Sequence, residues 1–309
     1  MILKLKNMIE EFSIISIYRH INPDMDAIGS QFGLKMWLNK NYPDKKVIVC
    51  GNDNYGEYEM DEEKLEDISN SLAFVLDTSA SDRVDGNYFD KAKCSVKIDH
   101  HPQIETFTNL EFVDTSKAAT CQYVPIILDE IKNNSICSDA ASFFYKGILT
   151  DTLSFKTTNT TKETFDVASK LISTGLDISK LSREVYDRPL AEYKFISFLR
   201  TKLQFFNSIG YAIIKVDEVK DFNISMNKAR SHVAEFGNIN ELDVWCLFTQ
   251  SDTDNNCYKG SIRSKHLNLI EIANKYTGGG HKNACGVKNL SIEDIDKLLK
   301  DIDQSLNKI

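Results

Sequence analysis

The sequence lacks the features of a disulfide-bonded or membrane-spanning protein. Its seven cysteines are odd in number, scattered, and never form a CxxC pair, which argues against a disulfide framework and a cysteine zinc site. Neither a secretory signal nor a long apolar run is visible, because the N-terminus alternates charged and apolar residues in MILKLKNMIEEFSIISIY. These absences predict a protein of the reducing cytoplasm, without a membrane partner.

An excess of positive charge is also missing. The 37 Lys and Arg residues face 45 Asp and Glu residues, for a net charge of −8. Long nucleic acids bind through Lys and Arg side chains that neutralise phosphates, so the sequence predicts no general affinity for long nucleic acid. A local anion site stays compatible with this balance, because such a site depends only on its own charges.

Short apolar runs alternate with helical patterns in the first half of the chain. The runs are FSIISIY, KKVIVCG, SLAFVLD and CSVKID. Strands that are apolar on both faces and separated by helices predict an α/β fold with a parallel sheet and helices on both faces. Helical patterns then dominate, and strand-like runs return near residue 209. We expect an N-terminal domain at 1–190, a helical linker at 191–207 and a smaller α/β domain at 208–309.

Carboxylates and histidines gather at the ends of these predicted strands. They are His20, Asp24, Asp26, Asp77, Asp99, His100, His101 and, after a helical segment, Asp151. In an open parallel sheet, the carboxyl ends of the strands border the ligand crevice. Carboxylates held close together repel one another unless cations neutralise them. A mixed oxygen and imidazole set suits manganese or a related divalent ion better than structural zinc.

The number of candidate ligands supports two metal ions. The first could be held by His20, Asp24 and Asp77, and the second by Asp26, Asp77, His100 and Asp151, with Asp77 bridging. Each motif alone also fits a polar loop or a helix cap, and it is their conjunction that favours metal. Two-metal sites generate hydroxide and stabilise displacement at phosphorus, so we expect a phosphohydrolase.

Four segments resemble, in order, the motifs of the DHH phosphoesterase superfamily: HINPDMDAIGS, FVLDTS, KIDHHP and GILTDT. Two later segments, GSIRSK and GGGHKNACG, resemble its DHH-associated domain. The resemblance implies the same metal ligands, two ions that are Mn²⁺ (or Mg²⁺ or Co²⁺), and a catalytic first domain. It also implies that His101 faces the substrate phosphate and that Asp99 orients a histidine. The segment DTSKAATCQYV departs from the family pattern at Ala118, Ala119 and Gln122. These departures leave open whether the segment makes a polar contact with the site.

The C-terminal motifs predict a substrate-binding domain. A guanidinium can bind a phosphate through two parallel hydrogen bonds, and glycines permit close approach of a nucleotide. A flexible loop is the alternative for the glycine run. The predicted substrate-binding residues are Arg263, Ser264, Gly279, Gly280 and His281.

The resemblance points to the branch of bifunctional oligoribonucleases and pAp phosphatases. It implies hydrolysis of RNA of about two to five nucleotides and of adenosine 3′,5′-bisphosphate (pAp). The alternatives are a phosphodiesterase of cyclic dinucleotides or of linear dinucleotides such as pGpG and pApA, and a nucleotide-binding regulator without catalysis. A homodimer is left open.

Overall fold

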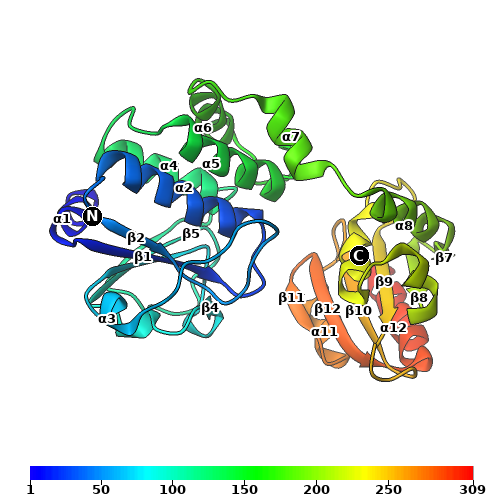
Figure 1. The fold of residues 1–309 in the computed structure, drawn as a ribbon. Helices are drawn as coiled ribbons and strands as arrows, with labels where there is room; N and C mark the ends of the chain where they lie inside the picture. Colours follow the sequence, from blue (N-terminus) through cyan, green and yellow to red (C-terminus); the bar gives the residue numbers. More distant parts are fainter. Residues whose placement is uncertain (309) are drawn as a thin grey trace. The chain divides into compact units, whose positions relative to one another are not determined.

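The chain forms two compact units, residues 1–187 and residues 188 onward. They are seen in a computed structural model that describes residues 1–308, with the side chain of His281 outside the described part (Figure 1).

The first unit is built on a parallel sheet. Its strands follow the order β2-β1-β3-β5-β6, and the short β4 pairs antiparallel with the end of β1. The bounds are β1 Ile14–His20, β2 Lys46–Val49, β3 Leu72–Leu76, β4 Val84–Asp85, β5 Cys94–Asp99 and β6 Leu110–Val113. All of β3 is buried, as expected for a strand covered on both faces. The predicted parallel α/β sheet is confirmed.

Helices cover the two faces of this sheet unequally. The long helices α1 (Ile2–Glu11), α2 (Met25–Asn41), α4 (Thr120–Ile131) and α5 (Ser138–Asp151) share one hydrophobic core with Leu72, Phe74 and Leu76 of β3. The alternate residues Ala73 and Val75 face a smaller core, covered by α3 (Leu65–Ile68) and the turn η2 (Phe89–Lys91). Figure 1 shows α2, α4 and α5 on one side of the sheet and α3 on the other. The helices α6 (Lys162–Ile172) and α7 (Ile178–Tyr186) and the turn η1 (Ser81–Arg83) complete the unit.

Glycines let α2, α4 and α5 approach closely. A Cβ at Gly29 of α2 would lie 2.7 Å from the carbonyl oxygen of Phe143, and one at Gly147 of α5 would lie 2.3 Å from Cys121 Sγ. Both distances are too short for real atoms, so neither position has room for a side chain. This close packing brings the N-terminus of α4 against the first turn of α2.

The second unit is a mixed sheet with helices on both faces. Its strands follow the order β11-β12-β10-β9-β8-β7, and only β8 and β9 pair in parallel. The strands are β7 Gln204–Phe206, β8 Ile209–Ile214, β9 Val244–Gln250, β10 Tyr258–Ser264, β11 Gly279–His281 and β12 Ala284–Leu290. One core involves α11 (Ile270–Lys275) and α12 (Ile292–Leu306), and the other involves α8 (Leu190–Thr201), α10 (Met226–Ser231) and η4 (His232–Phe236). The short α9 (Val216–Val219) and η3 (Lys220–Phe222) complete it. This smaller α/β unit is also as predicted.

The segment between the expected domains is structured. Residues 191–207, predicted as a helical linker, contain most of α8 together with β7. Phe195 and Leu199 of α8 are buried in a core of the second unit. The boundaries of the functional domains stay a prediction.

Within residues 1–308, no helix combines the length and the apolar character that crossing a membrane requires.

Candidate active site

The predicted acids and histidines meet at the carboxyl ends of the strands in the first unit. His20 ends β1, Asp77 follows β3, and Asp99 ends β5, followed by His100 and His101. The helices supply the rest: Asp24 and Asp26 come from the start of α2, and Asp151 ends α5. Their ligand atoms form three overlapping groups that could hold a metal ion: His20 with Asp24 and Asp77, Asp26 with His100 and Asp151, and Asp77 with His100 and His101.

Asp77 lies at the centre of this cluster. Its Oδ2 is 3.4 Å from His20 Nε2, and its Oδ1 is 3.5 Å from His100 Nε2 and 3.4 Å from His101 Nδ1. Its backbone has a φ of 53°, in the left-handed region that few residues other than glycine adopt. Such strain persists where the surrounding structure imposes it, as at functional sites. The strained turn holds the Asp77 carboxylate between the histidines.

Asp26 binds the N-terminus of α4. Its Oδ2 accepts a hydrogen bond from the N–H of Thr120 at 2.7 Å, and its Oδ1 accepts one from the N–H of Cys121 at 2.8 Å. The first N–H groups of a helix have no partner within the helix and carry partial positive charge, so they favour a carboxylate there. Burial, followed by the charges of Asp77 and Asp24, nevertheless raises the pKa of Asp26 well above its usual value.

Asp24 caps α2, the helix that carries Asp26. Its Oδ1 accepts hydrogen bonds from the N–H groups of Asp26 and Ala27, which makes it the N-cap of α2. The same oxygen lies 4.0 Å from His20 Nε2. The side chain is well exposed, so it can both cap the helix and offer a lone pair to an ion.

Two histidines are oriented by backbone carbonyls. His20 Nδ1 is 2.8 Å from the carbonyl oxygen of Ile21, and His100 Nδ1 is 3.3 Å from that of Lys117. When Nδ1 donates to a carbonyl, the neutral ring carries its lone pair on Nε2. Both Nε2 atoms face the acids, and His100 Nε2 lies 3.5 Å from Asp151 Oδ2 and 3.8 Å from Asp26 Oδ2. This is the tautomer and orientation of metal-binding histidines.

His101 is placed differently, because Asp99 holds it. Its Nδ1 is 2.9 Å from Asp99 Oδ1, and its backbone N–H donates to the same oxygen. Burial alone would lower the pKa of His101, but the hydrogen bond to Asp99 and the charge of Asp77 raise it to about 9. The imidazolium therefore carries its charge at neutral pH and can attract a phosphoryl oxygen.

The residues present fit divalent metal ions. Burial, followed by the charge of Asp26, raises the pKa of Asp151 to about 8, and a bound cation would oppose both effects. The nearby Cys121 does not compete as a ligand, because burial raises the pKa of its thiol and its Sγ donates to the carbonyl of Asp26. The available donors are carboxylate oxygens and imidazole nitrogens, as manganese and magnesium sites prefer.

Thr120 is a site residue that sequence reasoning did not identify. Its hydroxyl donates to Asp77 Oδ1 at 3.0 Å, while its backbone N–H donates to Asp26. Gln122 instead bonds to Ala118 and Thr164 within the fold. In the segment DTSKAATCQYV, the polar contact with the site is therefore made by Thr120. The available signal was a threonine at the start of a helical pattern, where N–H groups are unpartnered.

A second candidate site lies within the second unit. A cavity of about 610 Å³ is lined by the cationic side chains of Arg230, Lys259, Arg263 and Lys288, and no acidic residue of the described chain lines it. Arg263 lies on β10, where its Nη1 donates to the carbonyl oxygen of Ile262. Burial lowers the pKa of Arg263, so binding an anion would stabilise its charged form. Arg230, Lys259 and Lys288 were not predicted.

The other predicted substrate residues divide between the cavity and the core. Gly279 and Gly280 line the cavity, where they form the short strand β11 rather than an open loop. Ser264 is buried, and its hydroxyl donates to the carbonyl oxygen of Leu267. Ser261, two residues along the strand from Arg263, lines the cavity instead. The side chain of His281 lies outside the described part of the structure.

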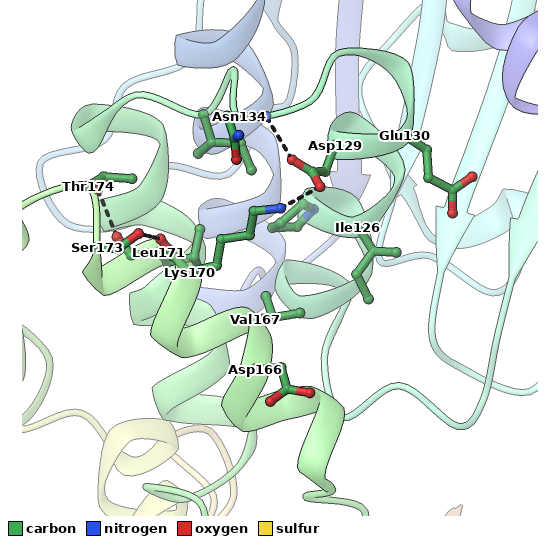
Figure 2. Close-up of a pocket in the computed structure, with 12 residues that line it drawn as sticks. Ile126, Asp129, Glu130, Asn134, Asp166, Val167, Lys170, Leu171, Ser173 and Thr174 are labelled. Atoms are coloured by element: carbon green, nitrogen blue, oxygen red, sulfur yellow. Dashed lines mark hydrogen bonds and ion pairs between the residues drawn. The ribbon is translucent and has the colours of Figure 1, made fainter.

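Another cavity, of about 480 Å³, lies between α4 and α6 (Figure 2). Its walls are largely apolar, with Ile126 and Val167 on opposite helices and an ion pair between Asp129 and Lys170 at its rim. Among the described residues, none of the predicted site residues lines it.

A cluster of carboxylates and imidazoles at the strand ends of an open parallel sheet is the kind of site that metal-dependent phosphoesterases use. Residues 14–148 match the DHH family, N-terminal domain, and residues 208–308 match the DHHA1 domain. The chain belongs to the DHH family of phosphoesterases.

Relatives cover nearly the whole chain. The probable bifunctional oligoribonuclease and PAP phosphatase NrnA of Streptococcus mutans is 32% identical over 95% of this chain and 96% of its own length. The bifunctional oligoribonuclease and PAP phosphatase NrnA of Bacillus subtilis is 30% identical over 94% of each chain. An exopolyphosphatase-related protein from Bacteroides fragilis shares the fold, with a TM-score of 0.86, 21% identity and coverage of 99% of this chain and 95% of its own.

Proposed function

We propose that the chain hydrolyses short oligoribonucleotides to mononucleotides and removes the 3′-phosphate of pAp. The observation that carries the proposal is the convergence of His20, His100 and His101 on Asp77, at 3.4 to 3.5 Å. The names of the Streptococcus and Bacillus relatives support this choice of substrates. Buried free thiols such as Cys50 and Cys246 fit a reducing compartment, and we place the protein in the cytoplasm.

The proposal includes two divalent metal ions, with Mn²⁺ preferred and Mg²⁺ or Co²⁺ as alternatives. The first would be held by His20, Asp24 and Asp77, whose ligand atoms form one adjacent group. The second would be held by Asp26, Asp77, His100 and Asp151; Asp26, His100 and Asp151 form another group, and Asp77 adjoins His100 in a third. When bound, such ions lower the pKa of water and stabilise charge that develops on phosphoryl oxygens.

The chain's own residues supply binding and orientation. The positive charge of His101, held by Asp99, attracts phosphoryl oxygens beside Asp77. In the second unit, Arg263 binds a phosphate group of the nucleotide, assisted by the other cations of the cavity.

We infer that the substrates are short because the chain carries a net charge of −8. Once the four cations of the cavity in the second unit are paired, we expect each further phosphate to contribute repulsion rather than a new ion pair. Turnover per RNA end should fall steeply beyond about five nucleotides, with a shallow salt dependence. Equal or faster cleavage of a long RNA, with a steep salt slope, would contradict this part of the proposal.

The test is a turnover assay of the purified chain with Mn²⁺ on a diribonucleotide, pAp, pGpG and a cyclic dinucleotide. Asp77→Asn should lower every hydrolysis by orders of magnitude, because one ligand charge is lost from both ions. Asparagine tolerates positive φ, so the turn at Asp77 should survive. Asp44→Asn, which alters an exposed carboxylate outside the cluster, is the matched control.

The outcomes separate the alternatives. Faster turnover of the cyclic dinucleotide than of the diribonucleotide and pAp would favour the phosphodiesterase. Binding of nucleotides without release of phosphate or mononucleotides would favour the non-catalytic regulator. Full activity of a folded Asp77→Asn protein would refute the assignment of the metal ligands.

A further inference from the structure

A cavity of about 380 Å³ within the first unit is lined in part by residues that are direct neighbours in sequence of the proposed metal ligands. One of its lining residues is Met25, which stands between Asp24 and Asp26, and another is Thr150, which directly precedes Asp151. Its volume falls in the range of small-molecule sites. Of the described residues that line it, none has a part in the proposed metal binding.

A tight turn presents two tyrosines to this cavity. The N–H of Tyr58 donates to the carbonyl oxygen of Tyr55 at 3.0 Å, and the chain between them passes through Gly56, whose φ of 59° favours glycine. Tyr58 is fixed by ring contacts with Phe32 and Phe143 at 5.4 and 5.5 Å. Tyr55 is 37% exposed, so part of its ring remains accessible.

Polar groups lie beside these rings. Lys146 of α5 is buried, and its Nζ donates to the Tyr58 hydroxyl at 2.8 Å and to Glu184 Oε2 at 3.3 Å. Among the hydrogen bonds of the described residues, the Tyr58 hydroxyl donates to none, so its proton can serve an acceptor in the cavity. Glu184 offers a carboxylate acceptor at the same wall. An aromatic ring with one donor and one acceptor is the chemistry that binds a nucleobase.

The two proposed substrates, pAp and a dinucleotide, differ in whether a second nucleoside must be bound near the metal cluster. In both, the phosphate that is cleaved is esterified to the 3′-oxygen of a nucleoside, and hydrolysis adds water across that P–O bond. With pAp the products are a 3′-hydroxyl and inorganic phosphate. With a dinucleotide the phosphate leaves as the 5′-phosphate of a second nucleoside, which must extend from the metal cluster across the neighbouring surface.

We propose that the cavity between the Tyr55–Tyr58 turn and Lys146 binds this second nucleoside, with its base against the ring of Tyr55. The inference rests on the proposed function and deepens it. It makes Tyr55 a determinant of specificity for dinucleotides over pAp. Because every base has a π-face, stacking there suits substrates of any sequence.

The experiment compares pApA, pAp and a pApA analogue whose second nucleotide is abasic. Stacking of one base on an aromatic side chain corresponds to about 5- to 150-fold in binding. Tyr55→Ala should therefore lower the ratio of kcat/KM for pApA to kcat/KM for pAp by about that factor. Tyr55→Phe should keep most of the ratio, because the ring remains. Tyr193→Ala, which alters a tyrosine of the second unit that is 65% exposed, is the matched control.

The abasic analogue isolates the base itself. The wild-type protein should cleave it more slowly than pApA, and Tyr55→Ala should bring the two rates together. An unchanged ratio in Tyr55→Ala, or an equal loss on pApA and on the analogue, would overturn the inference and leave the proposed function in place. A wild-type protein that hydrolyses neither pApA nor pAp would instead refute the proposed function, and the inference with it.

Discussion

Without divalent cations, the first unit should lose stability as the pH rises from about 6 to about 9. Burial and the charge of Asp26 raise the pKa of Asp151 to about 8. Burial opposes the charge on His101, but its bond to Asp99 raises the pKa of that imidazole to about 9. The unfolded chain titrates near pKa values of about 3.9 for Asp and about 6.5 for His. In this range the folded state therefore holds more protons than the unfolded state, and the free energy of unfolding falls with pH.

The magnitude follows from the number of protons involved. Each group can contribute at most about 1.4 kcal/mol per pH unit while its folded form is protonated and its unfolded form is not. The side chains of Asp151 and His101 are 31% and 33% exposed, so solvent screens part of both effects. We expect a combined slope of about 1 kcal/mol per pH unit. Asp77 adds no slope here: burial opposes its charge, but its hydrogen bond to His20 holds its pKa below the usual value.

Urea unfolding with EDTA, and again with Mn²⁺, measures this slope. Trp37 lies in the first unit and Trp245 in the second, so the fluorescence of a Trp245→Phe protein follows the first unit alone. Mn²⁺ should stabilise the unit more at higher pH, because metal ligands must be deprotonated. Asp151→Asn should flatten the slope in EDTA and make the metal-free protein more stable near pH 8, while it weakens metal binding.

Asp44→Asn is the control and should keep the wild-type slope. A metal-free stability that is flat or rises between about pH 6 and pH 8 would refute the reasoning. So would an Asp151→Asn protein that retains the full slope.

Substitutions at three further positions test the packing of the first unit and the role of Arg263. Gly147→Ala should destabilise the fold by about 1–3 kcal/mol in thermal unfolding and lower its metal content, because the added Cβ would lie 2.3 Å from Cys121 Sγ; unchanged stability would contradict the close packing. Arg19→Met should cost about 3–5 kcal/mol in chemical unfolding, because it leaves Asp85 without its buried ion pair; a loss below about 1 kcal/mol would refute this. Arg263→Ala should weaken substrate binding by about 2–3 kcal/mol at unchanged metal content, and Arg263→Lys should restore only part; metal loss would show that Arg263 acts on the metal cluster.

The sequence pattern predicts the first sheet and its acid cluster well, because both follow from local rules. Apolar runs such as LAFVL at β3 are buried on both faces, and parallel strands bring their carboxyl ends to one edge. The three groups of adjacent ligand atoms consist of residues that were predicted as ligands or as a catalytic residue. Their binding of metal stays a prediction.

The cationic cavity is harder to predict, because it depends on alternation and on tertiary contacts. Neighbouring residues on a strand face opposite sides, so Arg263 and Ser264 cannot both line the cavity along β10. Alternation places Arg263 on the same face of the strand as Ser261 and Lys259, and all three line the cavity. Arg230 comes from the end of α10, far along the chain, and no local rule connects it with β10.

The cluster around Asp77 is held in place by the protein itself. The N–H groups of α4 fix Asp26, the Thr120 hydroxyl fixes Asp77, and the carbonyl of Ile21 fixes His20. None of these contacts requires a cation, so removing metal should leave the donors close together. What remains is the repulsion among the carboxylates, which the folded chain relieves by taking up protons. For this reason the absence of metal should appear as a pH-dependent loss of stability rather than as collapse of the site.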